Sequence, residues 1–353
     1  MDRAPRMNFM SDNTAGAAPA VIDAIARAND GREASYGADQ ASRRLAKRFA
    51  DLFEKDVIVH PVLTGTAANS LSIATFCPSW GAVFCHAGAH ILVDECGAPE
   101  FFSGAKLVPV EGDGGKLTPQ GLKAALGHFQ PGFVHHVQPK MVSLTEATEL
   151  GTTYKPDEIA AISAMAHERG MRVHMDGARF ANAVAGSGKS PAELTWKSGV
   201  DVLSFGATKN GALAAEAVIF FNPAEAGDFE YRRKRSGHLV SKMRYVSAQL
   251  DAMLDNGLWL ALAGQANAMA RRLEAGLRAI PGVGIAHAVE ANEVFFTLPD
   301  HAARGRLEKE GARFYVWSSS EDPVPLIRLV CAFSTTTAEV DAFLAAARRT
   351  LGV

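Results

Sequence analysis

The sequence predicts an α/β fold, in which a mostly parallel sheet carries helices on both faces and a small α+β domain follows. Two observations predict it. Short apolar runs alternate with longer amphipathic segments up to about residue 230, and after that the pattern changes. Strands that alternate with helices of this length are typical of βαβ units, which build parallel sheets. The chain has 353 residues, which is enough for one large and one small domain.

The first part of the chain supplies the predicted parallel sheet. Seven short apolar runs are expected to be strands, at 57–60, 82–85, 106–110, 133–137, 172–175, 200–205 and 217–222. Segments 66–76, 118–128 and 156–169 are expected to be helices. The third helix has clear boundaries, because Pro156 suits the first helical position, two acidic residues follow it, and Gly170 suits the C-terminal end.

The last part of the chain has a different pattern. Residues 231–279 are rich in Ala, Leu, Arg and Met and are predicted to be nearly continuous helix, interrupted near 256–257. Strands are then expected at 283–286, 293–298, 313–316 and 326–330, with helices that begin at Asp300 and Thr337. We place the boundary at residue 255, so that residues 1–255 form the large domain and 256–353 the small C-terminal domain.

Composition and charge exclude several classes of function. The net charge is −2, so the chain lacks the basic surplus that nucleic-acid binding needs. Its apolar stretches are far shorter than the roughly 20 residues of a membrane-spanning helix, and its N-terminal segment lacks the apolar core of a secretion signal. The four cysteines form no CxxC pair, which suits a reducing compartment. We therefore expect a cytoplasmic enzyme with a small-molecule substrate and neither a nucleic-acid nor a membrane partner.

Three segments that could carry chemistry follow predicted strands, at the sheet edge where open α/β sheets bind ligands. LTGTAAN at 63–69 turns through a glycine into a helix, whose N–H groups could hold a phosphate. HMDGAR at 174–179 places Asp176 at a strand tip near Arg179, and SFGATKNG at 204–211 places Lys209 in a loop of small residues. Each segment taken alone also fits an ordinary capped turn, an ion pair or a surface lysine.

Taken together, the three segments are more specific than any one of them. An imine-forming lysine, an acid that pairs with a ring nitrogen and an anion cradle are the parts that pyridoxal phosphate requires. One crossover connection fits between Asp176 and Lys209. Asp176 could therefore meet the pyridinium nitrogen while Lys209 reaches the aldehyde carbon, with the phosphate on the turn at 64–66.

The motifs resemble those of the L-threonine aldolase family of fold-type-I pyridoxal-phosphate enzymes, over essentially the whole chain. They are SDNT at 11–14, SYG at 35–37, TGTAAN at 64–69, AH at 89–90, DE at 94–95, DGAR at 176–179, TK at 208–209 and RLV at 328–330. The ATKNG loop and TEATE at 145–149 resemble a bacterial branch of low specificity. The resemblance implies an aspartate-aminotransferase-like large domain and a carbon–carbon lyase. Such an enzyme cleaves L-threonine, L-allo-threonine or phenylserine to glycine and an aldehyde by a retro-aldol reaction.

The resemblance also implies roles for individual residues. Lys209 would hold the cofactor covalently and Asp176 would pair with its ring nitrogen. Further cofactor-binding positions would be Gly65, Thr66, His90, Arg179, Thr208 and Arg244. Substrate-binding positions would be Ser11, Tyr36, Arg179 and Arg328. Tyr36 and Arg244 match positions that reach a neighbouring subunit's site, so a homo-oligomer, dimer or tetramer, with composite sites is expected.

One position departs from the family pattern. Family members commonly carry a histidine that touches the substrate's β-hydroxyl group, and Glu149 stands at that place here. His90, which the resemblance places against the cofactor ring, is then the main candidate for the base that takes the hydroxyl proton. Glu149 acting through a water molecule is the alternative.

Other functions stay open from the residues alone. β-Elimination or transamination would use the same Lys209 and Asp176. A nucleotide-binding oxidoreductase is disfavoured because no GxGxxG follows an early strand, and a non-catalytic binding protein is disfavoured by the set of Lys209, Asp176 and Arg179. No metal site is expected, because His86 and His90 lack the glutamate of an HExxH motif and the adjacent histidines at 135–136 would point to opposite faces of a strand.

Overall fold

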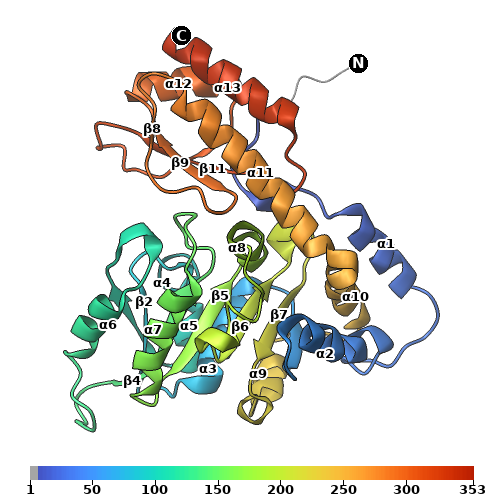
Figure 1. The fold of residues 1–353 in the computed structure, drawn as a ribbon. Coiled ribbons are helices and arrows are strands. Elements are labelled where there is room, and N and C mark those ends of the chain that lie inside the picture. Colours follow the sequence, from blue (N-terminus) through green and yellow to red (C-terminus); the bar gives the residue numbers. More distant parts are fainter. Residues whose placement is uncertain (1–6) are drawn as a thin grey trace.

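The large sheet contains seven strands within residues 7–353, the part of the chain that the computed structural model describes (Figure 1). Their order is β1-β7-β6-β5-β4-β2-β3. The strands are β1 (Ile58–Val62), β2 (Gly81–His86), β3 (Lys106–Val110), β4 (Gln138–Thr145), β5 (Arg172–Gly177), β6 (Val202–Gly206) and β7 (Glu216–Phe220). Neighbours from β3 to β6 are parallel, and β7 lies antiparallel to both β6 and β1. The predicted mostly parallel sheet is confirmed.

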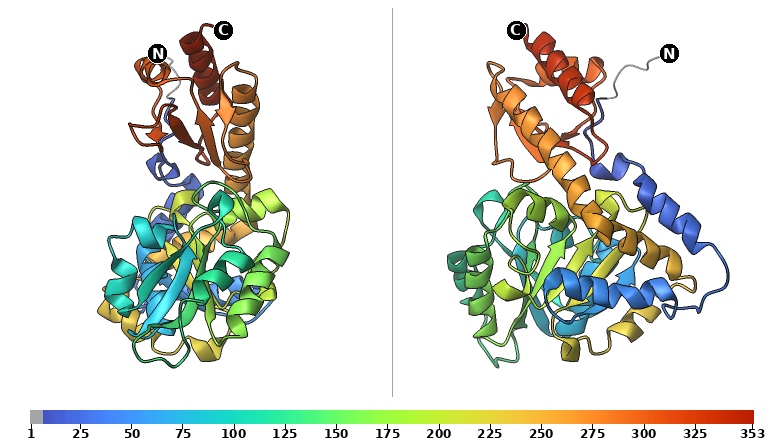
Figure 2. Two further views of the ribbon diagram at one scale, coloured as in Figure 1. Left: turned by 90° about the vertical axis from the view of Figure 1, so that its left-hand side faces the viewer. Right: turned by 45° about the vertical axis from the view of Figure 1, so that its right-hand side comes forward.

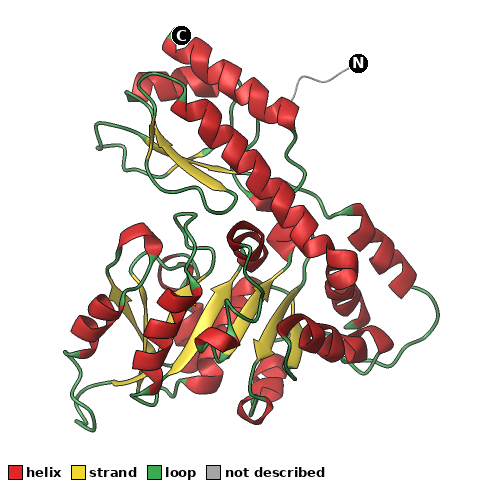
Figure 3. Cartoon of the chain, viewed as in Figure 1, coloured by secondary structure: helices red, strands yellow, loops and turns green. Residues whose placement is uncertain are grey.

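Helices cover both faces of this sheet, as expected (Figure 3). The helices of the large domain are α1 (Pro19–Ala28), α2 (Gln40–Phe53), α3 (Gly65–Phe76), α4 (His90–Val93), α5 (Ala98–Ser103), α6 (Pro119–Leu126), α7 (Pro156–His167), α8 (Phe180–Ser187), α9 (Phe229–Arg235) and α10 (Arg244–Leu254). On β2, Phe84 packs in the cluster that contains α2, α6 and α7, while Val83 and Cys85 pack in the cluster that contains α3 and α9. This alternation is the two-residue period of a strand buried on both faces.

The strand expected at 133–137 is wrong. These residues form a turn between α6 and β4, and the strand begins at Gln138 instead. Val134 is 89% exposed, so the apolar run has no partner face to pack against. The Gln138 side chain closes the turn by donating to the carbonyl oxygens of Gln130, Phe133 and His136. The two adjacent histidines therefore lie in this turn rather than on opposite faces of a strand.

The prediction of nearly continuous helix over 231–279 is correct in its break near residue 256 and wrong in a second place. Asn256 and Gly257 have positive φ angles of 48° and 68° and separate α10 from α11 (Leu258–Arg278). Residues 236–243 are also non-helical and separate α9 from α10. Gly237 adopts a φ of 83° there, a conformation that ends helices.

The C-terminal sheet has the order β10-β11-β9-β8 and is antiparallel. Its elements are β8 (Gly284–Ile285), β9 (Glu293–Thr297), α12 (His301–Lys309), β10 (Tyr315–Val316), β11 (Leu326–Val330) and α13 (Thr337–Leu351). Phe9 joins the core of this unit, where it packs on Phe343. The long helix α11 runs from the large sheet's side of the molecule to the C-terminal sheet (Figure 2). It contributes Trp259 to the large core and Leu277 to the small one. The domain boundary at residue 255 stays a prediction.

Within residues 7–353, no helix is long and apolar enough to cross a membrane. The strand ends of β5 and β6, the start of α3 and the C-terminal sheet all meet at one junction, and this junction holds the candidate site.

Candidate functional site

The three segments singled out in the sequence line two adjoining cavities of about 260 and 60 Å³. Asp176 near the end of β5 is in register with Ser204 on β6, and the loop that follows β6 carries Lys209. The residues common to both cavities are Gly65, Thr66, His90, Asp176, Ala178 and Lys209. The structure thus brings the lysine, the aspartate and the glycine turn together as the sequence predicted.

Lys209 lies in a short 3-10 turn, Thr208–Asn210, that is fixed on both sides. On one side, the N–H of Ala207 donates to Oε2 of Glu216 at 2.7 Å. On the other, Nδ2 of Asn210 donates to the carbonyl oxygen of Trp259 at 2.8 Å. A loop held in this way keeps the amine at the cavity without a large loss of entropy on binding.

Asp176 is a buried carboxylate, 3% exposed, and its neighbours supply hydrogen-bond donors. Nδ2 of Asn69 donates to its Oδ2 at 2.8 Å, and the N–H of Ala178 donates to its Oδ1 at 3.1 Å. Buried carboxylates are costly without such donors. The acid is therefore held in a fixed orientation where it lines the cavity.

Asn69 links Asp176 to a second buried acid. Its Nδ2 also donates to Oε1 of Glu95 at 2.9 Å, and the same oxygen accepts a hydrogen bond from Nδ1 of His90 at 2.9 Å. With the proton on Nδ1, Nε2 of His90 is left as an acceptor. The hydrogen bond to Glu95 raises the pKa of His90, against the effect of burial.

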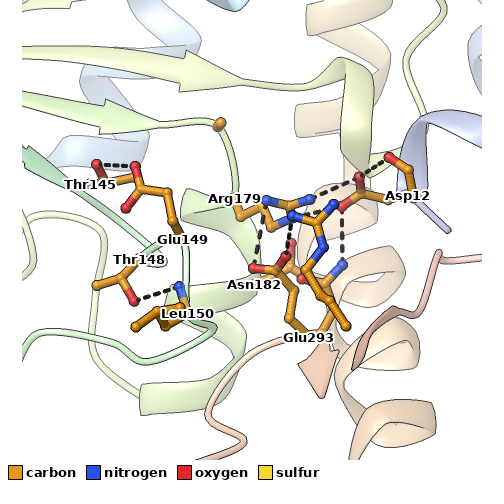
Figure 4. Close-up of polar contacts among 12 residues, drawn as sticks. Asp12, Thr145, Thr148, Glu149, Leu150, Arg179, Asn182 and Glu293 are labelled. Atoms are coloured by element: carbon orange, nitrogen blue, oxygen red, sulfur yellow. Dashed lines mark hydrogen bonds and ion pairs between the residues drawn. The ribbon is translucent and has the colours of Figure 1, made fainter. Parts of the chain in front are cut away.

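Glu149 lies beside Thr145 (Figure 4), and it lines the smaller cavity together with His90 and Glu95. Its Oε1 accepts from the N–H of His90 at 2.8 Å and from Oγ1 of Thr145 at 2.8 Å. Its Oε2 is buried and has no hydrogen-bond partner among the described residues. Burial raises the pKa of Glu149 to about 7. The acid therefore populates both protonation states near neutral pH.

Arg179 joins a cluster of charges where the large sheet meets the C-terminal sheet (Figure 4). Its Nε and Nη2 atoms donate to the two carboxylate oxygens of Asp12, at 2.8 and 3.2 Å. Its Nη1 lies 3.6 Å from Glu293, which in turn lies 3.8 Å from Arg328. Burial alone would raise the pKa of Asp12, and the adjacent Arg179 guanidinium lowers it overall. Two cations and two anions thus neutralise each other at the junction.

The predicted substrate residues Ser11 and Arg328 lie in this cluster rather than among the residues that line the cavities. Oγ of Ser11 donates to Oδ1 of Asp12 at 3.4 Å. The Arg328 guanidinium stacks over the rings of Tyr315 and Trp317, at 5.1 and 4.8 Å. Their link to the site is the charged cluster, in which Arg179 lines the smaller cavity.

The turn that begins α3 has the open space that an anion needs. Oγ1 of Thr64 caps the helix by accepting from the N–H of Ala67 at 3.2 Å. The first N–H groups of a helix have no partner within it, and those of Gly65 and Thr66 are in this position. A Cβ added to Gly65 would meet nothing within 4 Å, so the space before the turn is free.

Two predicted residues lie away from the cavities. Tyr36 is half exposed, and its ring faces Nζ of Lys234 at 4.5 Å. Arg244, at the start of α10, donates to the carbonyl oxygen of Gly31 at 3.3 Å. Within this single chain, neither side chain lines the site.

Sequence reasoning gave no role to several residues that the structure places in the site. Asn69, Glu95 and Asp12 belonged to recognised motifs, and Glu293 and Glu216 did not. A charged residue at the start of an otherwise apolar strand was the available signal for the last two. Among residues 7–353, no group of histidine, cysteine, aspartate and glutamate residues is arranged to hold a metal ion.

Comparisons with known proteins agree with this geometry. The family model described as beta-eliminating lyase matches residues 8–301. A low specificity L-threonine aldolase from Pseudomonas sp. is 46% identical over 94% of both chains, and one from Pseudomonas aeruginosa is 48% identical over 88% of this chain and 89% of its own. A solved threonine aldolase structure from Leishmania major superposes with a TM-score of 0.91 at 29% identity, covering 97% of this chain and 98% of its own.

Proposed function

Because the chain belongs to the beta-eliminating lyase family and, within it, to the low-specificity L-threonine aldolases, we propose that Lys209, Asp176 and His90 carry out its retro-aldol cleavage. The chain is an aldehyde-lyase that uses pyridoxal phosphate, and its fold is of type I. The observation that supports the assignment is that Lys209 and Asp176 line one cavity from adjacent strand ends.

The residues of the cavity fit the cofactor. The amine of Lys209 suits an aldehyde, the buried carboxylate of Asp176 suits a protonated ring nitrogen, and the open turn at Gly65 and Thr66 suits a phosphate. Thr208 precedes the lysine in the same loop and lines the same cavity. When bound, pyridoxal phosphate supplies an electron sink for the α-carbon of an amino acid.

His90 is proposed to move the proton of the β-hydroxyl group. Nε2 is the nitrogen left as an acceptor once Nδ1 donates to Glu95, so the ring is already in the tautomer that a base needs. Glu95 is a positioning residue, because it acts only through His90 and Asn69. Glu149, whose Oε2 is free, is the rival base and would act through water.

The charged cluster is proposed to orient the substrate. Arg328 offers a guanidinium to an α-carboxylate, held in place by stacking on two aromatic rings. Ser11 adds a hydroxyl group that contacts Asp12, and Arg179 stays fixed by its two bonds to the same Asp12. We expect L-threonine, L-allo-threonine and phenylserine to be accepted as substrates.

The active form is proposed to be a homo-oligomer with composite sites. Tyr36 is half exposed, and neither Tyr36 nor Arg244 lines the two site cavities of its own chain. A closed two-fold assembly would let each reach a neighbour's cavity, which is the common geometry of homo-oligomers.

The proposed role of Lys209 can be tested by borohydride reduction of the purified holoenzyme followed by peptide mapping. We expect reduction to fix the cofactor on Lys209 and to remove the visible absorbance. Lys209→Ala should keep its far-ultraviolet circular dichroism and lose the label, whereas Lys189→Ala, at an exposed lysine, should be labelled like the wild type. A label on any other lysine would refute the assignment.

A further inference from the structure

Glu216 is a buried acid between the two segments that are assigned to the cofactor. It begins β7, where it pairs with Val62 at the end of β1 and with Gly206 at the end of β6. The phosphate turn follows β1 directly, and the Lys209 loop follows β6. Glu216 is 7% exposed and lines the larger cavity together with Gly65.

The hydrogen bond that Glu216 accepts from the backbone does not need a negative charge. Oε2 accepts the N–H of Ala207 at 2.7 Å, which a neutral carboxyl or carboxamide oxygen can also do. An ionised carboxylate in this place would repel a phosphate dianion held at the neighbouring turn. A protonated carboxyl would instead present an O–H donor to it.

The surroundings of Glu216 favour the protonated form. Burial raises the pKa of Glu216 to about 7, with contacts from Thr208 and Ala207 and the charge of Lys209 acting the other way. The other titratable groups that line the same cavity are Lys209, Asp176 and His90. On adjacent elements, His238 accepts the N–H of Leu63 and His60 stacks on Phe229, and neither histidine lines the cavity.

We propose that Glu216 is a further cofactor-binding residue, which holds the phosphate in its protonated form by donating a hydrogen bond. This inference rests on the proposed function, because it takes the cofactor to lie in this cavity. A bound dianion favours the protonated acid still more, so binding takes up a proton where the free protein has lost it. The affinity for the phosphate therefore falls as the pH rises above neutrality.

The test compares two ligands that differ only in the phosphate. Full-length protein stripped of cofactor is titrated with pyridoxal phosphate and with pyridoxal between pH 6 and 9, and binding is read from absorbance. The dissociation constant of pyridoxal divided by that of pyridoxal phosphate isolates the phosphate contribution from the chemistry of Lys209. In the wild type we expect this ratio to fall roughly tenfold between pH 7 and pH 8.5. The phosphate itself, with a second pKa of about 6, stays a dianion over that range.

Two variants complete the design. Glu216→Gln keeps an acceptor for Ala207 and a donor for the phosphate but cannot ionise, so its ratio should stay high and flat up to pH 9. Glu149→Gln removes an acid of similar pKa that lines only the smaller cavity, and its ratio should fall as in the wild type.

Three results would overturn the proposal: a flat ratio in the wild type, an equal fall in Glu216→Gln, or a ratio in Glu216→Gln that is already low at pH 7. The wild-type curve decides alone if Glu216→Gln does not fold. Failure of the proposed function is a separate result, because then neither ligand would bind to Lys209.

Discussion

His90 is held from two sides by acids that differ in what they do. Glu95 accepts from Nδ1 of the ring, and Glu149 accepts from the backbone N–H. The first contact sets the tautomer and raises the pKa of the ring. The second holds the backbone of His90 in place. These contacts are consistent with the proposal that His90 is the base, with Glu149 as the rival.

Replacement of His90 by Phe should separate its two roles. A phenyl ring keeps an aromatic surface for the cofactor but cannot take a proton, so cofactor binding should persist. We expect kcat on phenylserine to fall by about 10²–10⁴-fold, the usual effect of losing a general base. The measurement is steady-state kinetics together with the absorbance of the bound cofactor.

The pH profile gives the control for this prediction. Activity needs neutral His90, so it should rise with pH through the pKa of that ring. Glu95→Gln replaces a charged acceptor by a neutral one and so weakens the hydrogen bond that raises this pKa, and the rising limb should move to lower pH. Near-wild-type turnover by His90→Phe would instead place the base elsewhere, with Glu149 as the better candidate.

Three of the residues that sequence reasoning identified share one property: each lies just beyond a predicted strand or at the start of a predicted helix. Lys209, Asp176 and Gly65 could be recognised in this way. Asn69 could not be given a role, because its two partners lie 26 and 107 residues away in the sequence. The role of Glu216 could not be predicted for the same reason, because its position depends on strands that meet only in the folded sheet.

At the scale of elements, buried strands were the most predictable feature. The strands β3 and β11 begin and end where the apolar runs do, and β5 to β7 differ by one or two residues. The apolar run at 133–137 lies instead in an exposed turn outside the sheet. Local pattern measures the preference of a segment, and tertiary pairing decides whether that preference is used.

The breaks between helices show the same limit of prediction from local sequence pattern. The interruption near residue 256 was marked by an Asn-Gly pair, which tolerates positive φ. The loop at 236–243 carries only Gly237 as a comparable signal, within a run rich in helix-forming residues. This loop places Arg244 at the start of α10.

At the scale of the whole molecule, the site is assembled from distant parts of the chain. Asp12 comes from the N-terminal segment, Arg179 from the end of β5, and Arg328 from the C-terminal sheet. The N-terminal segment is fixed there because Phe9 exchanges backbone hydrogen bonds with Arg313 and Val330. The charged cluster therefore exists only when both cores are formed.

The proposed composite site leads to a prediction about mixed oligomers. Lys209→Ala and Arg244→Ala should each be nearly inactive alone. When the two are dissociated and reassembled together, some sites combine an intact Lys209 with an intact Arg244 from the other subunit, so activity should return. Sedimentation checks that oligomers have formed. An active monomer, or no recovery from confirmed hybrids, would contradict the proposal.

The most direct measurement is the joint assay of glycine and aldehyde released from L-threonine, L-allo-threonine and phenylserine by the purified holoenzyme, with Lys209→Ala as the blank. Retro-aldol cleavage predicts glycine and the matching aldehyde in equal amounts from each substrate, and neither product from the variant. Ammonia with a keto acid would indicate elimination, and transfer of the amino group without glycine would indicate transamination; either result would contradict the assignment of this site to Cα–Cβ cleavage.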